Sequence, residues 1–200
     1  MCYNPSKPNV KIVRKKALPM ARLAGENVML REFRWEDLPE MRRWICDGRA
    51  TRYLGTRFIR PQTWEQTEQM LRGLLMGEAG GESLVIADIG TLGYLGQISL
   101  QGVDRFSQQA ELAVIVSPEH WGKGVATEAI GLMLRYAFHA LNLNRVWLKV
   151  FAEHEAAVRL YRKCGFVQEG VLRQDAFLEG RYRDTIVMSV LRDDFNKAQA

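Results

Sequence analysis

The chain has 200 residues, of which 47% are hydrophobic and 26% charged, so it is long enough to bury the core of one domain. It has no apolar run of roughly 18 residues and no apolar segment after its basic start, which argues against a membrane span or a secretory signal. Its three cysteines are scattered and lack metal-ligand spacing to the histidines. We therefore expect a cytoplasmic protein with no metal and no membrane partner.

The first segment, residues 1–20, carries the formal net charge of +5. It holds five basic and no acidic side chains, so the rest of the chain is formally neutral. We expect residues 1–20 to be a basic, partly disordered extension and residues 21–200 to be the folded domain. A neutral body without a stripe of basic and aromatic residues argues against nucleic acid as a partner.

The rest of the chain alternates between strand and helix patterns, and we find no repeat or linker in it. The predicted elements, in chain order, are a strand at 27–34, helices at about 36–46 and 62–76, strands at 83–88, 94–100 and 109–116, a long helix at about 126–141, a strand at 145–151, a helix at 154–164, and strands at 166–173 and 183–191. This order predicts one mixed α/β (α+β) domain, with helices on both faces of a mostly antiparallel sheet.

The junction between the strand at 109–116 and the long helix is the most informative part of the chain. Residues 110–116 are apolar except for Glu111, which is typical of a strand buried on both faces. A loop with Gly122, Lys123 and Gly124 then leads to the start of the helix. Unpaired amides and the helix dipole there suit a phosphate, although the glycines would serve a tight turn equally well.

The loop Trp121-Gly122-Lys123-Gly124-Val125-Ala126 resembles the acetyl-CoA loop of the GNAT superfamily of N-acetyltransferases, Gln/Arg-x-x-Gly-x-Gly/Ala. Residues 157–166 resemble the Ala-x-x-Leu-Tyr-x-x-x-Gly-Phe segment of the same superfamily. The Trp-Gly-Lys-Gly form and the segment at 180–184 are similar to the ribosomal-protein-alanine N-acetyltransferase (RimJ/RimL) branch. The resemblance spans roughly residues 23–195 and implies a single GNAT-type domain that uses acetyl-CoA.

The resemblance also implies which residues bind the acetyl-CoA. The backbone of Val114, Ile115 and Val116 would face the pantetheine arm. The loop residues that would hold the pyrophosphate are Gly122, Lys123, Gly124, Val125, Ala126 and Thr127. His154 falls where many relatives have an asparagine that contacts the cofactor, but a histidine at the start of a helix is more often a cap or a surface residue.

Two residues are candidates for the chemistry. Tyr161 matches the general-acid tyrosine of the superfamily, and a phenol with a pKa of about 10 stays protonated while a thiolate with a pKa of about 8.5 leaves. Its alternative role is that of a core tyrosine. Glu111 matches an acidic position of the branch and would act as a base through a water molecule, whereas an ion pair with an arginine explains it equally well.

The acceptor of the acetyl group is the least determined feature. An α-amine with a pKa near 8 is more often neutral than an amine near 10.4, which favours a protein N-terminus. A small-molecule amine, such as a polyamine, an aminoglycoside or an amino-acid-like compound, is the alternative within the enzyme class. A non-catalytic CoA-binding module is a further alternative, and the oligomeric state stays open, a homodimer included.

Overall fold

The structure is a computed structural model that describes residues 23–54, 58, 60–78 and 80–199. The basic extension predicted at 1–20 lies outside the described residues. Within the described ranges, no helix is long and apolar enough to cross a membrane.

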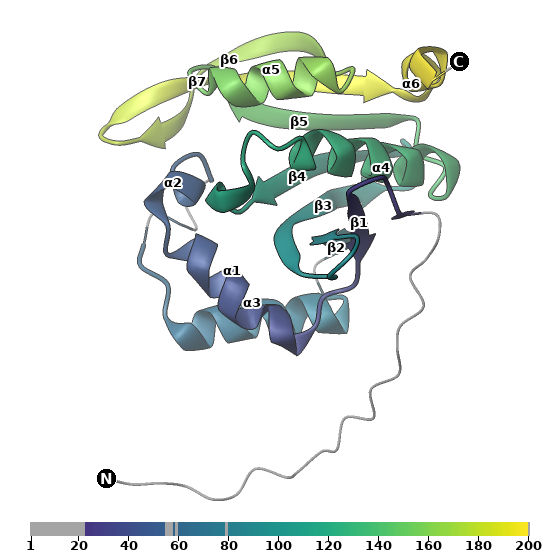
Figure 1. The fold of residues 1–200 in the computed structure, drawn as a ribbon. Helices are drawn as coiled ribbons and strands as arrows, with labels where there is room; N and C mark the ends of the chain where they lie inside the picture. Colours follow the sequence, from purple (N-terminus) through teal and green to yellow (C-terminus); the bar gives the residue numbers. More distant parts are fainter. Residues whose placement is uncertain (1–22, 55–57, 59, 79, 200) are drawn as a thin grey trace, which may run out of the picture.

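A seven-stranded sheet forms the centre of the molecule, with the strand order β1-β2-β3-β4-β5-β7-β6 (Figure 1). Every neighbouring pair is antiparallel except β4 and β5, which are parallel. The strands are β1 (Val28–Arg31), β2 (Glu82–Asp88), β3 (Tyr94–Asp104), β4 (Gln109–Val116), β5 (Arg145–Phe151), β6 (Val167–Leu178) and β7 (Arg181–Leu191). The predicted mixed, mostly antiparallel sheet is confirmed.

Helices cover both faces of this sheet, as the sequence predicts. They are α1 (Leu38–Ile45), α2 (Gly48–Thr51), α3 (Trp64–Met76), α4 (Val125–His139), α5 (Glu155–Lys163) and α6 (Arg192–Gln199), with 3-10 turns η2 (Trp35–Asp37) and η4 (Pro118–His120). Side chains of α4 and α5 join one buried cluster, and those of α1 and α3 join another. Figure 1 shows α1 and α3 lying together, away from α5.

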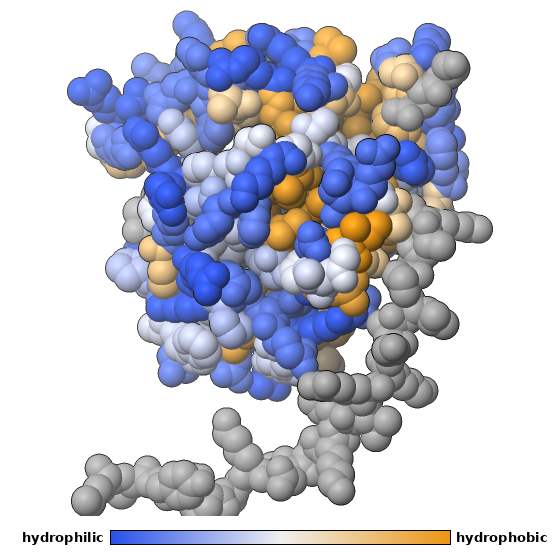
Figure 2. Space-filling model, viewed as in Figure 1, coloured by the Kyte–Doolittle hydropathy of each residue, from blue (hydrophilic) through white to orange (hydrophobic). Residues whose placement is uncertain are grey.

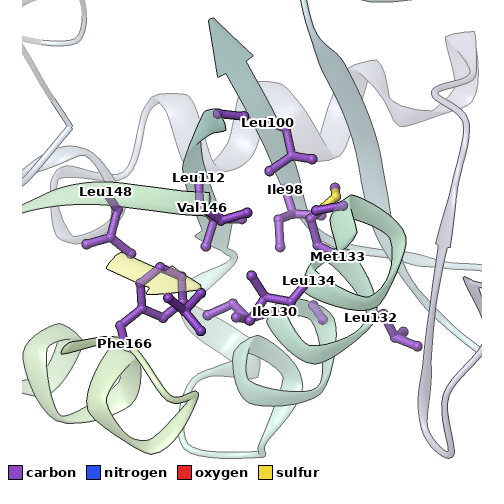
Figure 3. Close-up of a cluster of buried hydrophobic side chains, with 14 of the residues drawn as sticks. Ile98, Leu100, Leu112, Ile130, Leu132, Met133, Leu134, Val146, Leu148 and Phe166 are labelled. Atoms are coloured by element: carbon purple, nitrogen blue, oxygen red, sulfur yellow. The ribbon is translucent and has the colours of Figure 1, made fainter. Parts of the chain in front are cut away.

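The larger cluster lies between α4, α5 and the sheet (Figure 3). Apolar residues at helical spacing in α4 meet alternate residues of the strands, because every second strand side chain points to the same face. The cluster includes Ile98, Leu100, Leu112, Ile130, Met133, Leu134, Val146, Leu148 and Phe166, each no more than 4% exposed. The outer surface is different: on the face drawn in Figure 2, hydrophilic residues predominate and hydrophobic ones appear in limited areas.

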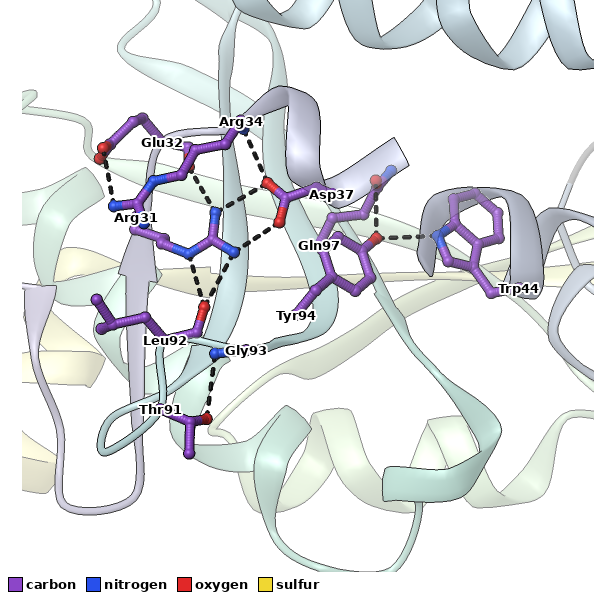
Figure 4. Close-up of polar contacts among 10 residues, drawn as sticks. All are labelled: Arg31, Glu32, Arg34, Asp37, Trp44, Thr91, Leu92, Gly93, Tyr94 and Gln97. Atoms are coloured by element: carbon purple, nitrogen blue, oxygen red, sulfur yellow. Dashed lines mark hydrogen bonds and ion pairs between the residues drawn. The ribbon is translucent and has the colours of Figure 1, made fainter. Parts of the chain in front are cut away.

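Buried polar contacts hold the layer of α1 and α3 on the sheet (Figure 4). Both terminal nitrogens of Arg31 in β1 donate to the carboxylate of Asp37, at 2.8 and 2.6 Å, and both side chains are buried. Arg31 also donates to the carbonyl of Leu92 in the β2–β3 turn. Farther along, Nε1 of Trp44 in α1 donates to the hydroxyl of Tyr94 at 2.9 Å. These bonds fix α1 relative to the strands.

Some predicted details are wrong. Strand β4 is not buried on both faces: Glu111 and the segment at 113–115 are only partly buried, and β5 no longer pairs with β4 beyond Glu111. The predicted pair at 166–173 and 183–191 is longer, since β6 and β7 continue to a turn at 179–180. The short helix α2 and the C-terminal helix α6 lack a clear apolar period, and the sequence did not predict them.

Candidate active site

The pairing between β4 and β5 ends halfway along both strands. The register runs from Gln109 opposite Arg145 to Glu111 opposite Trp147 and covers three residue pairs. Beyond this point β4 continues to Val116 on β3 alone, while β5 stays paired with β7 to its end. The edge of residues 112–116 that faces β5 therefore has no strand partner within the described chain, so its backbone groups are available to a ligand.

The loop after β4 exposes the start of α4. Gly122 and Gly124 have φ angles of +72° and +79°, in the left-handed region that favours glycine. Gly124 is the N-cap, and no side chain caps the helix, whose first bond runs from the amide of Glu128 to the carbonyl of Gly124. The amides of the first turn, residues 125–127, thus lack intrahelical partners. The loop at 121–124 is exposed, and a Cβ added at Gly122 or Gly124 would meet no atom of the described residues within 4 Å.

The indole of Trp121 closes the end of β4. Its Nε1 donates to the carbonyl oxygen of Val116 at 2.7 Å, while about half of the side chain remains exposed. The carbonyl of Val116 keeps a second lone pair, so its contact with the pantetheine arm stays a prediction. The backbone groups of successive strand residues point to alternate edges, so those of Val114 face the free edge and those of Ile115 face Gln97 in β3.

Glu128 attaches the start of α4 to the first strand. Its Oε1 accepts from the backbone amide of Asn27 at 2.9 Å and from that of Val28 at 3.3 Å, and its Oε2 accepts from the Asn27 side chain. Burial alone would raise the pKa of Glu128, but these hydrogen bonds outweigh it and lower the pKa. A carboxylate in the first turn also suits the helix dipole, so the loop has a rigid support.

Tyr161 lies on α5, at the edge of the larger cluster. Its ring meets that of Phe166 edge-on, with 5.8 Å between the centroids, and its hydroxyl has no hydrogen-bond partner among the described residues. Burial, with a smaller contribution from Cys164, raises the pKa of Tyr161 to about 12. The phenol is therefore protonated at neutral pH and free to donate.

His154 is the N-cap of α5. Its Nδ1 accepts a hydrogen bond from the amide of Ala157 at 3.0 Å, which places the proton of the neutral ring on Nε2. Burial lowers the pKa of His154, so the neutral ring predominates at pH 7. The capping role weighed for this histidine is confirmed. Its contact with a cofactor stays a prediction, for which Nε2–H is the available donor.

Glu111 lies at the point where β4 and β5 part. It faces the side of the sheet opposite Ala110 and Leu112, and no ion pair within 4.0 Å engages it among the described residues. Burial raises the pKa of Glu111, and the positive charge of Lys149 only partly opposes this. Lys149 itself donates to Asp175 at 3.3 Å. The ion pair with an arginine that was weighed for Glu111 is absent from this part of the structure.

A pocket of about 870 Å³ lies beyond the ends of β4 and β5. Trp121 and His154, which follow these two strands, form one side. The other lining residues come from α2 with the two residues after it, from Phe58, and from the end of β6 with the β6–β7 turn: Gly48, Arg49, Thr51, Arg52, Tyr53, Phe58, Phe177, Leu178, Glu179 and Gly180. The pocket thus adjoins the loop that the sequence singled out.

The sequence did not identify the pocket residues that come from the region of α2 and from the β6–β7 turn. The ring of Tyr53 meets the imidazole of His154 at 4.2 Å between centroids, and the guanidinium of Arg52 pairs with Glu179 at 2.9 Å. Arg52 and Glu179 lie 127 positions apart in the chain. Only the glycine turn after Glu179 gave a local signal, and it predicts a turn rather than a partner.

Comparisons with known proteins agree with this geometry. The family model described as an acetyltransferase (GNAT) domain matches residues 27–167. The chain belongs to this family. The spermidine N(1)-acetyltransferase of Vibrio cholerae is 40% identical over 101 residues, which are 50% of this chain and 58% of that protein. An uncharacterized N-acetyltransferase of Bacillus licheniformis, p20, is 30% identical over 182 residues, 88% of this chain and 99% of that protein.

A solved structure shares the whole fold. The crystal structure of spermidine N-acetyltransferase from Vibrio cholerae in complex with CoA and spermine superposes with a TM-score of 0.76 at 28% identity, covering 86% of this chain and 99% of that one. The GNAT resemblance and the fold are therefore confirmed. Neither the family model nor these three relatives indicates the RimJ/RimL branch, so that finer assignment stays a prediction.

Proposed function

We propose that the protein is an acetyl-CoA-dependent N-acetyltransferase whose acceptor is a small-molecule amine. One observation carries the proposal: β4 loses its partner strand just before a loop that exposes the unpaired amides of a helix start. The comparisons support the small-molecule acceptor, since the Vibrio cholerae enzyme that matches in both sequence and structure is named for spermidine. The sequence alignment covers 58% of the Vibrio enzyme, so the acceptor itself needs a direct test.

The loop fits a diphosphate by its own geometry. Gly122 and Gly124 turn the backbone so that the amides of residues 125–127 face outward, and a Cβ added to either glycine would meet no atom within 4 Å. Space for a ligand therefore lies directly above the backbone. The amides and the positive end of the α4 dipole would bind the pyrophosphate, and exposed Lys123 would add a cation.

The edge of β4 would align the rest of the cosubstrate. Its unpaired backbone groups at Val114 would bind the amides of the pantetheine arm, as a further strand would. Bound acetyl-CoA supplies a thioester as the activated acyl group. Transfer forms a carbon–nitrogen bond to the acceptor, breaks the carbon–sulfur bond, removes a proton from the amine and returns one to the sulfur.

Two side chains would move these protons. Tyr161 would donate its phenolic proton to the departing sulfur, since its raised pKa keeps it protonated throughout the working range of pH. Glu111 would accept the proton of the amine through water, because its position at the fork of the strands leaves it without an ion-pair partner. His154 would orient the cosubstrate with its Nε2–H.

The proposal is tested by an acceptor panel. The protein is incubated with acetyl-CoA and spermidine, a monoamine, an aminoglycoside or a peptide with a free N-terminal alanine, and the released thiol is measured. We expect spermidine or another small amine to give a kcat/KM at least about ten-fold above the peptide. Preference for the peptide would favour a protein N-terminus. Binding of acetyl-CoA without transfer to any amine would leave only a CoA-binding module.

A further inference from the structure

In the pocket beyond β4 and β5, the carboxylate of Glu179 and the ring of Tyr53 both contact the guanidinium of Arg52. Glu179, at the β6–β7 turn, accepts from Nη2 of Arg52 at 2.9 Å. The guanidinium of Arg52 also lies over the ring of Tyr53, 5.3 Å from its centroid. A carboxylate next to the face of a tyrosine is the combination that binds an alkylammonium group. Arg52 therefore occupies a cation site that its own chain provides.

We propose that Glu179 and Tyr53 form the subsite for the remote ammonium group of a polycationic acceptor, and that Arg52 is an internal competitor which this group displaces. The inference rests on the proposed function and specifies its acceptor. The side chains of Arg52 and Glu179 are 48% and 52% exposed, and ion pairs with such exposure contribute little to stability. A substrate can therefore break the pair without disturbing the fold.

The charges that line the pocket make this displacement necessary. Among the residues that the structure describes, the charged ones that line it are Arg49, Arg52 and Glu179, and Arg49 is already held by Asp47 at 2.6 Å. With Arg52 in place, Glu179 is neutralised and the pocket offers no unpaired carboxylate to a second cation. When Arg52 turns out toward solvent, Glu179 becomes free to pair with an ammonium group, which aligns the far end of a long acceptor.

Replacing the two partners of this ion pair has opposite expected effects. We expect Arg52→Gln to lower KM for spermidine about five-fold, because the competitor is gone, and Glu179→Gln to raise it about five-fold, because the carboxylate is gone. The double variant should behave like Glu179→Gln, since a competitor without a site has no effect. KM for acetyl-CoA and for n-butylamine, which has one ammonium group, should change less than two-fold.

Arg72 provides a matched control. It also pairs with a glutamate, Glu68 at 3.3 Å, and lies 5.3 Å from the centroid of an aromatic ring, that of Trp35, but it does not line the pocket. Arg72→Gln should leave KM for spermidine unchanged. If Arg52→Gln and Glu179→Gln instead both raise KM for spermidine, the ion pair only stabilises the pocket and the proposal is overturned.

Direct binding separates this inference from the proposed function. Isothermal titration calorimetry with spermidine in the presence of CoA should show the same opposite shifts in Kd for the two variants, whether or not acetyl transfer occurs. Protein that binds spermidine with these shifts but transfers no acetyl group would contradict the proposed function alone. Spermidine that does not bind, or binds equally to all variants, would overturn the subsite.

Discussion

The candidate site has two walls, and they are built in different ways. The wall that runs from β4 through the loop into α4 is one continuous segment, and its binding groups are backbone amides and carbonyls. The facing wall combines α2 with the β6–β7 turn, and its contacts are made by side chains such as those of Arg52 and Glu179. A backbone conformation restricts which residues can stand at neighbouring positions, whereas a side-chain pair across the fold restricts only the two residues that form it. The first wall is therefore suited to an invariant cosubstrate and the second to a variable acceptor.

The largest expected effect concerns the attachment of α1, which packs next to α2 of the facing wall. Asp37→Ala leaves the guanidinium of Arg31 buried without its counter-ion, so we expect the free energy of unfolding to fall by about 3–5 kcal/mol. Urea denaturation measures it. Glu32→Ala serves as the control, because its pair with Arg34 is exposed and should contribute less than about 1 kcal/mol. Equal losses in both variants would show that the buried pair does not support α1.

The next effect tests whether chemistry is placed between the two walls. Tyr161→Phe should reduce kcat about 100-fold while leaving Kd for acetyl-CoA unchanged, because only proton donation to the sulfur is lost. Since its pKa is raised to about 12, Tyr161 should cause no loss of activity as the pH rises from 7 to 10. Tyr136→Phe, a partly buried tyrosine of α4, should keep its kcat. A stable Tyr161→Phe variant with full activity would assign Tyr161 to the core.

A smaller effect tests whether the backbone conformation of the loop before α4 matters for binding, and it compares two glycines of that region. Gly124→Ala forces a side chain into the left-handed region, so we expect a loss of about 1 kcal/mol in stability and weaker binding of acetyl-CoA. Gly131→Ala, inside α4 and with open space around its Cβ position, should gain about 0.5–1 kcal/mol and bind acetyl-CoA as before. Calorimetry and thermal denaturation measure both, and the same sign for both would refute the role of the φ angle.

The smallest effect is a change in pH dependence. Burial raises the pKa of Glu111, so the carboxylate becomes protonated, and unable to accept a proton, as the pH falls through a value above its usual 4.5. Activity limited by this group should decline on the acidic side, and Glu111→Gln should flatten that limb of the kcat/KM profile. The same shift makes stability decrease as the pH rises through this window, because the folded state binds the proton more tightly. An unchanged acidic limb in Glu111→Gln would dismiss the base role.

Much of the fold was predictable from the sequence because its elements have regular patterns. The strands at Gln109–Val116 and Arg145–Phe151 were predicted with their actual bounds, and the helix ending before Gly77 was predicted with its actual end. The separation of β4 from β5 was not predictable, since the apolar run of β4 is the same whether or not a neighbour pairs with it. Burial on both faces was thus the wrong expectation for residues 113–115.

For the candidate site, the sequence by itself determined the parts that backbone conformation specifies: two glycines with positive φ, an uncapped helix start and a tyrosine in the last turn of the next helix. The tertiary structure alone decided the contacts that join distant segments, among them Trp121 with Val116, Tyr53 with His154, and Arg52 with Glu179. The physical reason is the distance along the sequence over which each kind of feature acts. A local conformation restricts the residues that adopt it, whereas a contact across the fold requires only that two chemically suitable side chains meet.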